Sequence, residues 1–180
     1  MTIATRRLIL RPFQSSDVDD VYTYAFHPEW GRYLQAYPEP YTRDDAEQFV
    51  SHAILQDRAQ YPILAIVMHG QVIGNISLRL DPSHRVAELA YALGRNYWRQ
   101  GFATEAVTAV IACGFHTLGL RKIFSTADAR NTGVIRLMGN MGMAKEGLLR
   151  SHRFSKGEYV DEVVYGILQS EWEFSAASRL

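Results

Sequence analysis

The sequence predicts a single α/β domain over residues 1–180, built on a mixed, mostly antiparallel central sheet of about seven strands flanked by about four helices. Two observations support this fold class. The length of 180 residues is typical of one domain. Segments with strand and helix patterns also alternate in the order strand, two helices, three strands, helix, strand, helix and two strands, and tight turns join several of the strands.

The first third of the chain is expected to supply one strand and two helices. Arg7–Phe13 alternates charged and aliphatic residues and predicts a strand. Ser16-Asp17-Val18-Asp19 is typical of a capping box, and apolar residues at helical spacing follow it. Prolines and tyrosines from Tyr33 to Tyr41 indicate a loop. Thr42-Arg43-Asp44-Asp45 repeats the capping signature and predicts a second helix.

The centre of the chain is rich in strand patterns. The continuous apolar run Ile63–Met68 is typical of a strand buried on both faces. His69-Gly70 then predicts a turn into the strand Val72–Leu80. Asp81-Pro82-Ser83-His84 predicts another turn, and Arg85–Leu93 a further strand.

In the rest of the chain the spacing of the apolar residues changes to the 3.6 residues of a helix and later back to the two residues of a strand. This spacing predicts a helix of about four turns from Ala103 to Leu118, which Gly119 stops, and a short strand Ile123–Ala127. A helix over Val134–Met141 follows, and then a hairpin of Leu148–Phe154 and Tyr159–Leu168 around Lys156-Gly157.

Composition excludes several classes of function. Lys plus Arg and Asp plus Glu both number 19, so the basic excess of a nucleic-acid-binding protein is missing. Cys113 is the only cysteine, which excludes an intrachain disulfide and a zinc site of several thiolates, and the scattered histidines predict no metal site. No apolar run of about 18 residues or signal-peptide pattern occurs. We therefore expect a cytoplasmic protein that binds neither nucleic acid nor membrane.

The segment Tyr97–Ala106 carries the strongest chemical signal. It lies between a strand and the strongest predicted helix, where backbone N–H groups meet the positive end of a helix dipole. Gly101 has no side chain and Ala103 only a methyl group, so the backbone is accessible to an anion. Arg99 adds a positive charge and Thr104 a hydroxyl. These features suit a pyrophosphate, although an ordinary strand-to-helix turn would look similar. The dinucleotide fingerprint and the P-loop pattern are both absent.

This segment resembles the coenzyme A motif of the GNAT superfamily of N-acetyltransferases, Gln/Arg-x-x-Gly-x-Gly/Ala. Gly101 and Ala103 match its last two fixed positions, while Trp98 stands where Gln or Arg is expected. The Tyr97-Trp98 pair is typical of the branch that contains the ribosomal-protein-alanine N-acetyltransferases, and Arg99 replaces a glycine common there.

The resemblance covers almost the whole chain. Its further segments are Thr5–Pro12, Val72-Ile73-Gly74, Ala87–Tyr91, Asn131–Met138, Met141-Gly142-Met143, Glu146-Gly147, Asp161, Tyr165 and Leu168–Trp172.

The resemblance implies transfer of an acetyl group from acetyl-CoA to a primary amine, either a protein N-terminal amine or a small-molecule amine. In this fold the strand before the turn splays from its neighbour, and the pantetheine pairs with its backbone, here Ala90–Leu93. The cofactor-binding residues that it implies are Ala92, Leu93, Arg99, Gln100, Gly101, Phe102, Ala103, Thr104 and Asn131. Asn131 also suits a helix N-cap, and one side chain could serve both roles.

Direct acetyl transfer needs a neutral amine, a polarised thioester and a proton for the thiolate. Glu88 is the candidate base, because alternation places it on the strand face of Ala90 and Ala92. It could instead be a solvent-facing glutamate or a ligand of a cationic substrate. Tyr165 is the candidate acid, with water or a purely core role as alternatives. Val134 stands where this branch often has the serine that could donate the proton.

Two other classes of function remain as alternatives. One is a non-catalytic module that senses acyl-CoA, which the valine at position 134 favours. The other is an RNA-associated interaction protein, which the missing basic excess disfavours. The expected partners are acetyl-CoA and an amine acceptor, and a homodimer is compatible with the sequence.

Overall fold

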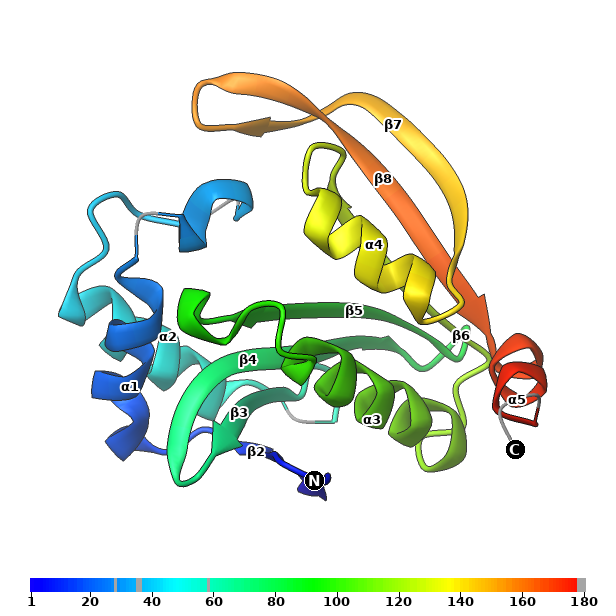
Figure 1. Cartoon of the computed structure of the whole chain (residues 1–180), viewed down its shortest axis with the longest axis horizontal. Helices are drawn as coiled ribbons and strands as arrows, with labels where there is room; N and C mark the ends of the chain where they lie inside the picture. Colours follow the sequence, from blue (N-terminus) through cyan, green and yellow to red (C-terminus); the bar gives the residue numbers. More distant parts are fainter. Residues whose placement is uncertain (28, 35–36, 58, 178–180) are drawn as a thin grey trace. The chain divides into compact units, whose positions relative to one another are not determined.

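The computed structural model describes residues 1–27, 29–34, 37–57 and 59–177 (Figure 1). The strands in this part of the chain are β1 (Ile3–Ala4), β2 (Ile9–Pro12), β3 (Ile63–Met68), β4 (Gln71–Asp81), β5 (Val86–Leu93), β6 (Lys122–Asp128), β7 (Ala144–Ser155) and β8 (Glu158–Leu168). The α-helices are α1 (Val18–Ala25), α2 (Arg43–Leu55), α3 (Phe102–His116), α4 (Thr132–Asn140) and α5 (Gln169–Ala177), and three short 3-10 turns, η1 (Ser15–Asp17), η2 (Trp30–Tyr33) and η3 (Arg95–Tyr97), join them.

The predicted fold class is confirmed. The described strands form one sheet in the order β1-β2-β3-β4-β5-β6-β8-β7. β5 and β6 are parallel, whereas the pairs β1–β2, β2–β3, β3–β4, β6–β8 and β7–β8 are antiparallel. The structure adds the two-residue strand β1 and the helix α5 to the expected seven strands and four helices. Neither contains enough residues with a regular apolar period to be predicted from sequence.

The chain forms two compact units. Met1–Arg79 and Ala90–Val110 make up the first, and Leu80–Leu89 and Ile111–Leu180 the second. The chain passes between them within β4, β5 and α3.

In the first unit, helices α1 and α2 pack together on an apolar core. The core includes Val21 of α1, Val50 of α2 and the strand β3, in which every side chain from Ile63 to Val67 is buried. This confirms the prediction of a strand covered on both faces. His69 (φ 49°) and Gly70 (φ 84°) form the expected tight turn into β4, since two left-handed residues match the twist of a hairpin.

The first capping box is displaced from its predicted position. The Gln14 backbone N–H donates to Asp17 Oδ2 at 2.8 Å, so Asp17 closes the short turn η1 before α1 begins. Both oxygens of Asp17 also accept from the Arg11 guanidinium at 2.8 Å. Asp17 is only 4% exposed, and a buried carboxylate needs such partners. The prediction of a capping box at Ser16–Asp19 was wrong, because the Asp17 carboxylate binds Arg11 and the Gln14 N–H and closes the turn before the helix.

The second unit is built on the antiparallel pairs β6–β8 and β7–β8. Residues Lys122–Asp128 of β6 lie opposite Leu168–Glu162 of β8. Lys156 (φ 49°) and Gly157 (φ 87°) form the turn between β7 and β8, which confirms the predicted hairpin. Buried Phe115, Ile123, Met138 and Ile167 contribute to its core.

Candidate coenzyme-binding and catalytic site

The end of β5 is held by hydrogen bonds from two residues that follow it. The Gly94 N–H donates to the Ile73 carbonyl of β4 at 2.8 Å. The Trp98 Nε1 donates to the Leu93 carbonyl at 2.6 Å, and the Arg95 guanidinium lies 4.8 Å from the centre of the Trp98 ring. Trp98 therefore anchors the backbone of the turn at the position where the family motif has Gln or Arg.

Arg99–Gly101 forms an exposed turn directly before α3, with φ 60° at Arg99 and φ 80° at Gly101. Left-handed backbone costs a non-glycine residue roughly 1–2 kcal/mol, so Arg99 is strained and Gly101 is not. The Glu105 N–H donates to the Gly101 carbonyl at 3.0 Å and closes the first turn of α3. The N–H groups of the residues between them have no acceptor inside the helix.

The side chains of this segment leave its backbone accessible. Arg99, Gln100, Gly101 and Thr104 are exposed, and Ala103 is half-buried. Phe102 is only 6% exposed, so its contribution to a ligand is limited to its backbone. Exposed amides at a positive helix end, next to the cation of Arg99, fit a diphosphate group such as that of coenzyme A.

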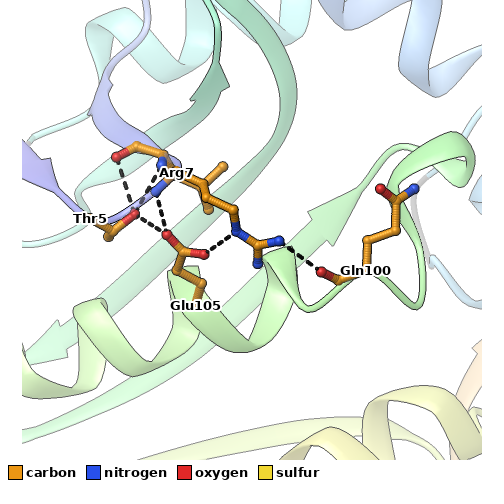
Figure 2. A network of polar contacts seen from close by, with 5 residues as sticks. Thr5, Arg7, Gln100 and Glu105 are labelled. Atoms are coloured by element: carbon orange, nitrogen blue, oxygen red, sulfur yellow. Dashed lines mark hydrogen bonds and ion pairs between the residues drawn. The ribbon is translucent and has the colours of Figure 1, made fainter.

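Polar contacts attach this segment to the start of the chain (Figure 2). Glu105 Oε1 accepts from the Thr5 hydroxyl at 2.6 Å and from the Arg7 backbone N–H at 2.7 Å. Glu105 Oε2 accepts from Arg7 Nε at 2.7 Å, and Arg7 Nη1 donates to the Gln100 carbonyl at 3.1 Å. Burial raises the pKa of Glu105, but the hydrogen bonds from Thr5 and Arg7 outweigh it and hold that pKa below its usual value. Glu105 is therefore ionised at neutral pH.

The two strand residues expected to bind the coenzyme differ in exposure. Leu93 is buried, and its carbonyl accepts from Trp98. Ala92 is half-buried on the preceding position of β5. Their backbone groups, rather than their side chains, are the groups suited to hydrogen bonding with a pantetheine.

Glu88 lies in the part of β5 that pairs with β6. The parallel ladder joins Val86–Glu88 to Lys122–Phe124, although β5 continues to Leu93 and β6 to Asp128. The half-buried Glu88 accepts a hydrogen bond from the Thr126 hydroxyl at 3.0 Å. This bond places Glu88 on the face of the sheet that carries Thr126.

Tyr165 lies on the opposite face from Glu88. It stands directly across from Ser125 in the β6–β8 ladder, and Ser125 precedes Thr126 in the chain. Since neighbouring strand residues point to opposite faces, the pair Ser125–Tyr165 and the pair Glu88–Thr126 are on different sides. The structure does not bring the two candidate catalytic side chains together.

Asn131 is the N-cap of α4. Its side-chain oxygen accepts from the Val134 N–H at 3.2 Å, as the capping alternative predicts. Asn131 remains half-buried, so this bond does not prevent a second contact. Val134 is also half-buried and has no group that could donate a proton.

Sequence reasoning missed the participation of Arg7 and Glu105 in this site. The Arg7 N–H and the Glu105 carboxylate are separated by 98 positions in the chain. Arg7 lies in the family-like segment Thr5–Pro12 and Glu105 in the segment Tyr97–Ala106, but neither residue was expected to contribute to the site. No local signal connects residues at such a separation.

Two kinds of feature are absent from the part of the chain that the structure describes. None of the described helices is long and apolar enough to cross a membrane. Within residues 1–27, 29–34, 37–57 and 59–177, no group of three or more His, Cys, Asp or Glu side chains could hold a metal ion.

Comparison with known proteins identifies the class. The model of the acetyltransferase (GNAT) domain matches residues 7–144, so the chain belongs to the GNAT family of acetyltransferases. The uncharacterized N-acetyltransferase p20 of Bacillus licheniformis is 32% identical over 174 residues, which cover 95% of this chain and 98% of p20.

Further relatives differ in the acceptors that their names give. A putative ribosomal N-acetyltransferase, YdaF of Bacillus subtilis, is 29% identical over 109 residues, 60% of each chain. The spermidine N(1)-acetyltransferase of Escherichia coli K12 is 26% identical over 168 residues, 91% of this chain and 87% of that enzyme. The crystal structure of a GNAT-family acetyltransferase from Bacillus anthracis superposes with a TM-score of 0.84 at 25% identity, covering 94% and 99% of the two chains.

Proposed function

We propose that this protein transfers an acetyl group from acetyl-CoA directly to a primary amine, within one domain spanning residues 1–180. The observation that carries the proposal is the exposed turn Arg99–Gly101, which leads into the N-terminus of α3. The acceptor is a protein N-terminal amine or a small-molecule amine. The names of YdaF and of the spermidine enzyme support one of these classes each.

In this proposal the coenzyme binds mainly to backbone. The N–H groups of Gly101–Thr104 face the pyrophosphate, and the guanidinium of Arg99 adds a positive charge. Gln100 supplies its backbone to the same turn. Ala92 and Leu93 pair with the pantetheine through their backbone groups, and Asn131 contacts the coenzyme from the start of α4. The early end of the β5–β6 ladder at Glu88 supports a role for the later β5 backbone in ligand binding.

Acetyl-CoA supplies the acetyl group as an activated thioester. Glu88 accepts the proton that the amine loses, and Thr126 holds that carboxylate by its hydrogen bond. A new C–N bond forms as the C–S bond breaks. Tyr165, or water, donates a proton to the thiolate. Glu88 of β5 and Tyr165 of β8 lie on opposite faces of the sheet, whereas the nitrogen and the sulfur are bonded to the same carbon during the transfer. Water on the Glu88 side is therefore the favoured proton donor to the thiolate.

Calorimetric titration with coenzyme A and acetyl-CoA tests the first half of the proposal. We expect saturable binding of both ligands, and no binding at millimolar ligand would overturn it. Release of free thiol from acetyl-CoA, measured with peptides, spermidine and other amines, tests the second half. Binding without thiol release for any acceptor would favour a non-catalytic sensor of acyl-CoA.

The cytoplasmic location and the homodimer stay predictions. Cell fractionation and the molar mass in solution are the corresponding measurements.

A further inference from the structure

The side chain of Arg7 contacts Gln100 and Phe102 and lies close to Gly101 between them, in the candidate coenzyme turn. Its Nη1 donates to the Gln100 carbonyl at 3.1 Å. A Cβ at Gly101 would lie 3.3 Å from its Nη2. Its guanidinium carbon lies 4.2 Å from the centre of the Phe102 ring. Arg7 therefore packs along the whole turn from Gln100 to the first residue of α3.

Glu105 holds Arg7 in this position. Its carboxylate accepts from both the backbone N–H and the Nε of Arg7, and from the Thr5 hydroxyl (Figure 2). Its own backbone N–H donates to the Gly101 carbonyl, so the same residue also closes the first turn of α3. The side chain of Glu105 is 16% exposed and that of Arg7 33%, which makes this pair more ordered than a fully exposed ion pair.

The bond from Arg7 to the Gln100 carbonyl determines the direction of one amide. The Gln100 carbonyl and the Gly101 N–H belong to the same planar trans peptide and point in opposite directions. A carbonyl directed at Arg7 therefore directs the Gly101 N–H away from Arg7. That side of the turn is the one available to a ligand.

We propose that Arg7 and Glu105 are a pair of positioning residues that orient the Gly101 amide toward the coenzyme pyrophosphate. The inference rests on the proposed function, since it concerns the same coenzyme site. It assigns Arg7 a role that differs from simple attraction of an anion. Glu105 neutralises the charge of Arg7, so the pair adds little net positive potential to the site.

Two variants separate positioning from charge. Arg7→Lys keeps the positive charge but loses the planar guanidinium that reaches Glu105 and Gln100 together. Glu105→Gln removes the negative charge and leaves Arg7 as an uncompensated cation near the ligand. Arg43→Lys is the matched control, because Arg43 forms an exposed ion pair with Asp19 at 2.9 Å between α2 and α1.

The measurement is calorimetric titration of the full chain with coenzyme A at low and high salt. We expect Arg7→Lys to weaken binding by about tenfold, Glu105→Gln to weaken it by at least about threefold, and Arg43→Lys to change it by less than about twofold. We also expect the Gly101 amide resonance to shift in ¹H–¹⁵N spectra of unliganded Arg7→Lys and to stay in place in Arg43→Lys.

Each alternative predicts a different result. If the pair acts only through charge, Arg7→Lys leaves the affinity unchanged and Glu105→Gln increases it, which overturns the inference. If the pair only stabilises the fold, both variants lower the melting temperature without changing the dissociation constant, which also overturns it. A variant that fails to fold is replaced by Thr5→Val, which removes one of the bonds to Glu105, together with the bond from the Leu8 N–H, and should weaken binding by about twofold to threefold.

Failure of the proposed function gives a separate signature. Wild-type protein would then not bind coenzyme A at all. Binding by the wild type together with unchanged affinity in Arg7→Lys would contradict the positioning role alone.

Discussion

Gly101 is the residue at which backbone conformation and ligand access are most closely linked. Residues with a Cβ rarely adopt its backbone φ of 80°. A Cβ at this position would also lie only 3.3 Å from Arg7 Nη2. Glycine is therefore required for two independent physical reasons.

Replacing Gly101 by valine should weaken coenzyme A binding by at least about tenfold, because its side chain displaces the Arg7 guanidinium that directs the Gly101 amide. Calorimetric titration measures the change. Gly70→Val is the matched control, since Gly70 has a similar φ of 84° and nothing within 4 Å of its added Cβ. Both variants carry the same kind of backbone strain. Equal affinities in Gly101→Val and wild type would show that the coenzyme turn lies elsewhere.

Glu88 has two candidate roles, that of a general base and that of a hydrogen-bond acceptor for Thr126. Its hydrogen bond from Thr126 is compatible with a base held in place and with a carboxylate that only satisfies a hydroxyl. Substitution of each partner separates these roles. A glutamine at position 88 can still accept from Thr126, whereas a valine at position 126 cannot donate to Glu88.

Glu88→Gln should lower kcat by about 10²-fold or more and flatten the dependence of turnover on pH, since the general base is lost while the hydrogen bond is kept. Thr126→Val should have a smaller effect, and the exposed Glu47→Gln on α2 serves as the control. The measurement is thiol release against pH with an amine that the wild type acetylates. An unaltered profile in Glu88→Gln would remove Glu88 as the base.

Among the elements, α2 shows how a local signal starts a helix. The Thr42 hydroxyl accepts from the Asp45 N–H at 3.2 Å, and Asp45 Oδ2 accepts from the Thr42 N–H at 2.8 Å. Each residue thus satisfies a backbone donor of the first turn that has no partner inside the helix. The hydrogen bonds of the Thr42 hydroxyl and N–H lower the pKa of Asp45.

Thr42→Ala should lower the free energy of unfolding by about 1 kcal/mol at neutral pH, because one of these donors loses its acceptor. The Asp45 pKa is lower in the folded chain than in the unfolded one, so the cap stabilises fully above about pH 4 and is lost as the pH falls through the folded pKa. Urea unfolding at neutral and acidic pH measures the difference between variant and wild type.

The difference should shrink in acid. Thr23→Ala on α1 is the control for this experiment. The Thr23 hydroxyl donates to the Asp19 carbonyl within the helix and caps no free donor, so its loss should be nearly neutral. A loss in Thr23→Ala as large as that in Thr42→Ala would contradict the capping role.

Elements with a strong local pattern were correctly predicted, and weak patterns were not. The buried strand β3, the long helix α3 and the hairpin β7–β8 each combine an apolar period with a turn or stop residue. β1 is only two residues long and needs its antiparallel partner β2 to exist as a strand. In α5, Trp172 contacts Phe115 with ring centres 6.4 Å apart, a tertiary contact that has no counterpart in the local sequence.

At the scale of the whole chain, the two compact units contain different parts of the proposed chemistry. The residues of the coenzyme turn, with Arg7 and Glu105, belong to the first unit. Glu88, Asn131 and Tyr165 belong to the second. The order of family-like motifs made all of these residues candidates except Arg7 and Glu105. Their segments also fit that order, but their contact joins positions 98 apart in the chain and has no local signal.

The sequence by itself determined the fold class, the family and the location of the turn that precedes α3. These properties depend on periodicity, on turn residues and on the order of short motifs, all of which are local. The tertiary structure alone decided that Arg7 contacts Gln100 and Glu105, that Asp17 pairs with Arg11, and that Glu88 and Tyr165 lie on opposite faces of the sheet. Strand register and contacts over about a hundred positions determine such pairings, and no period in a sequence encodes them.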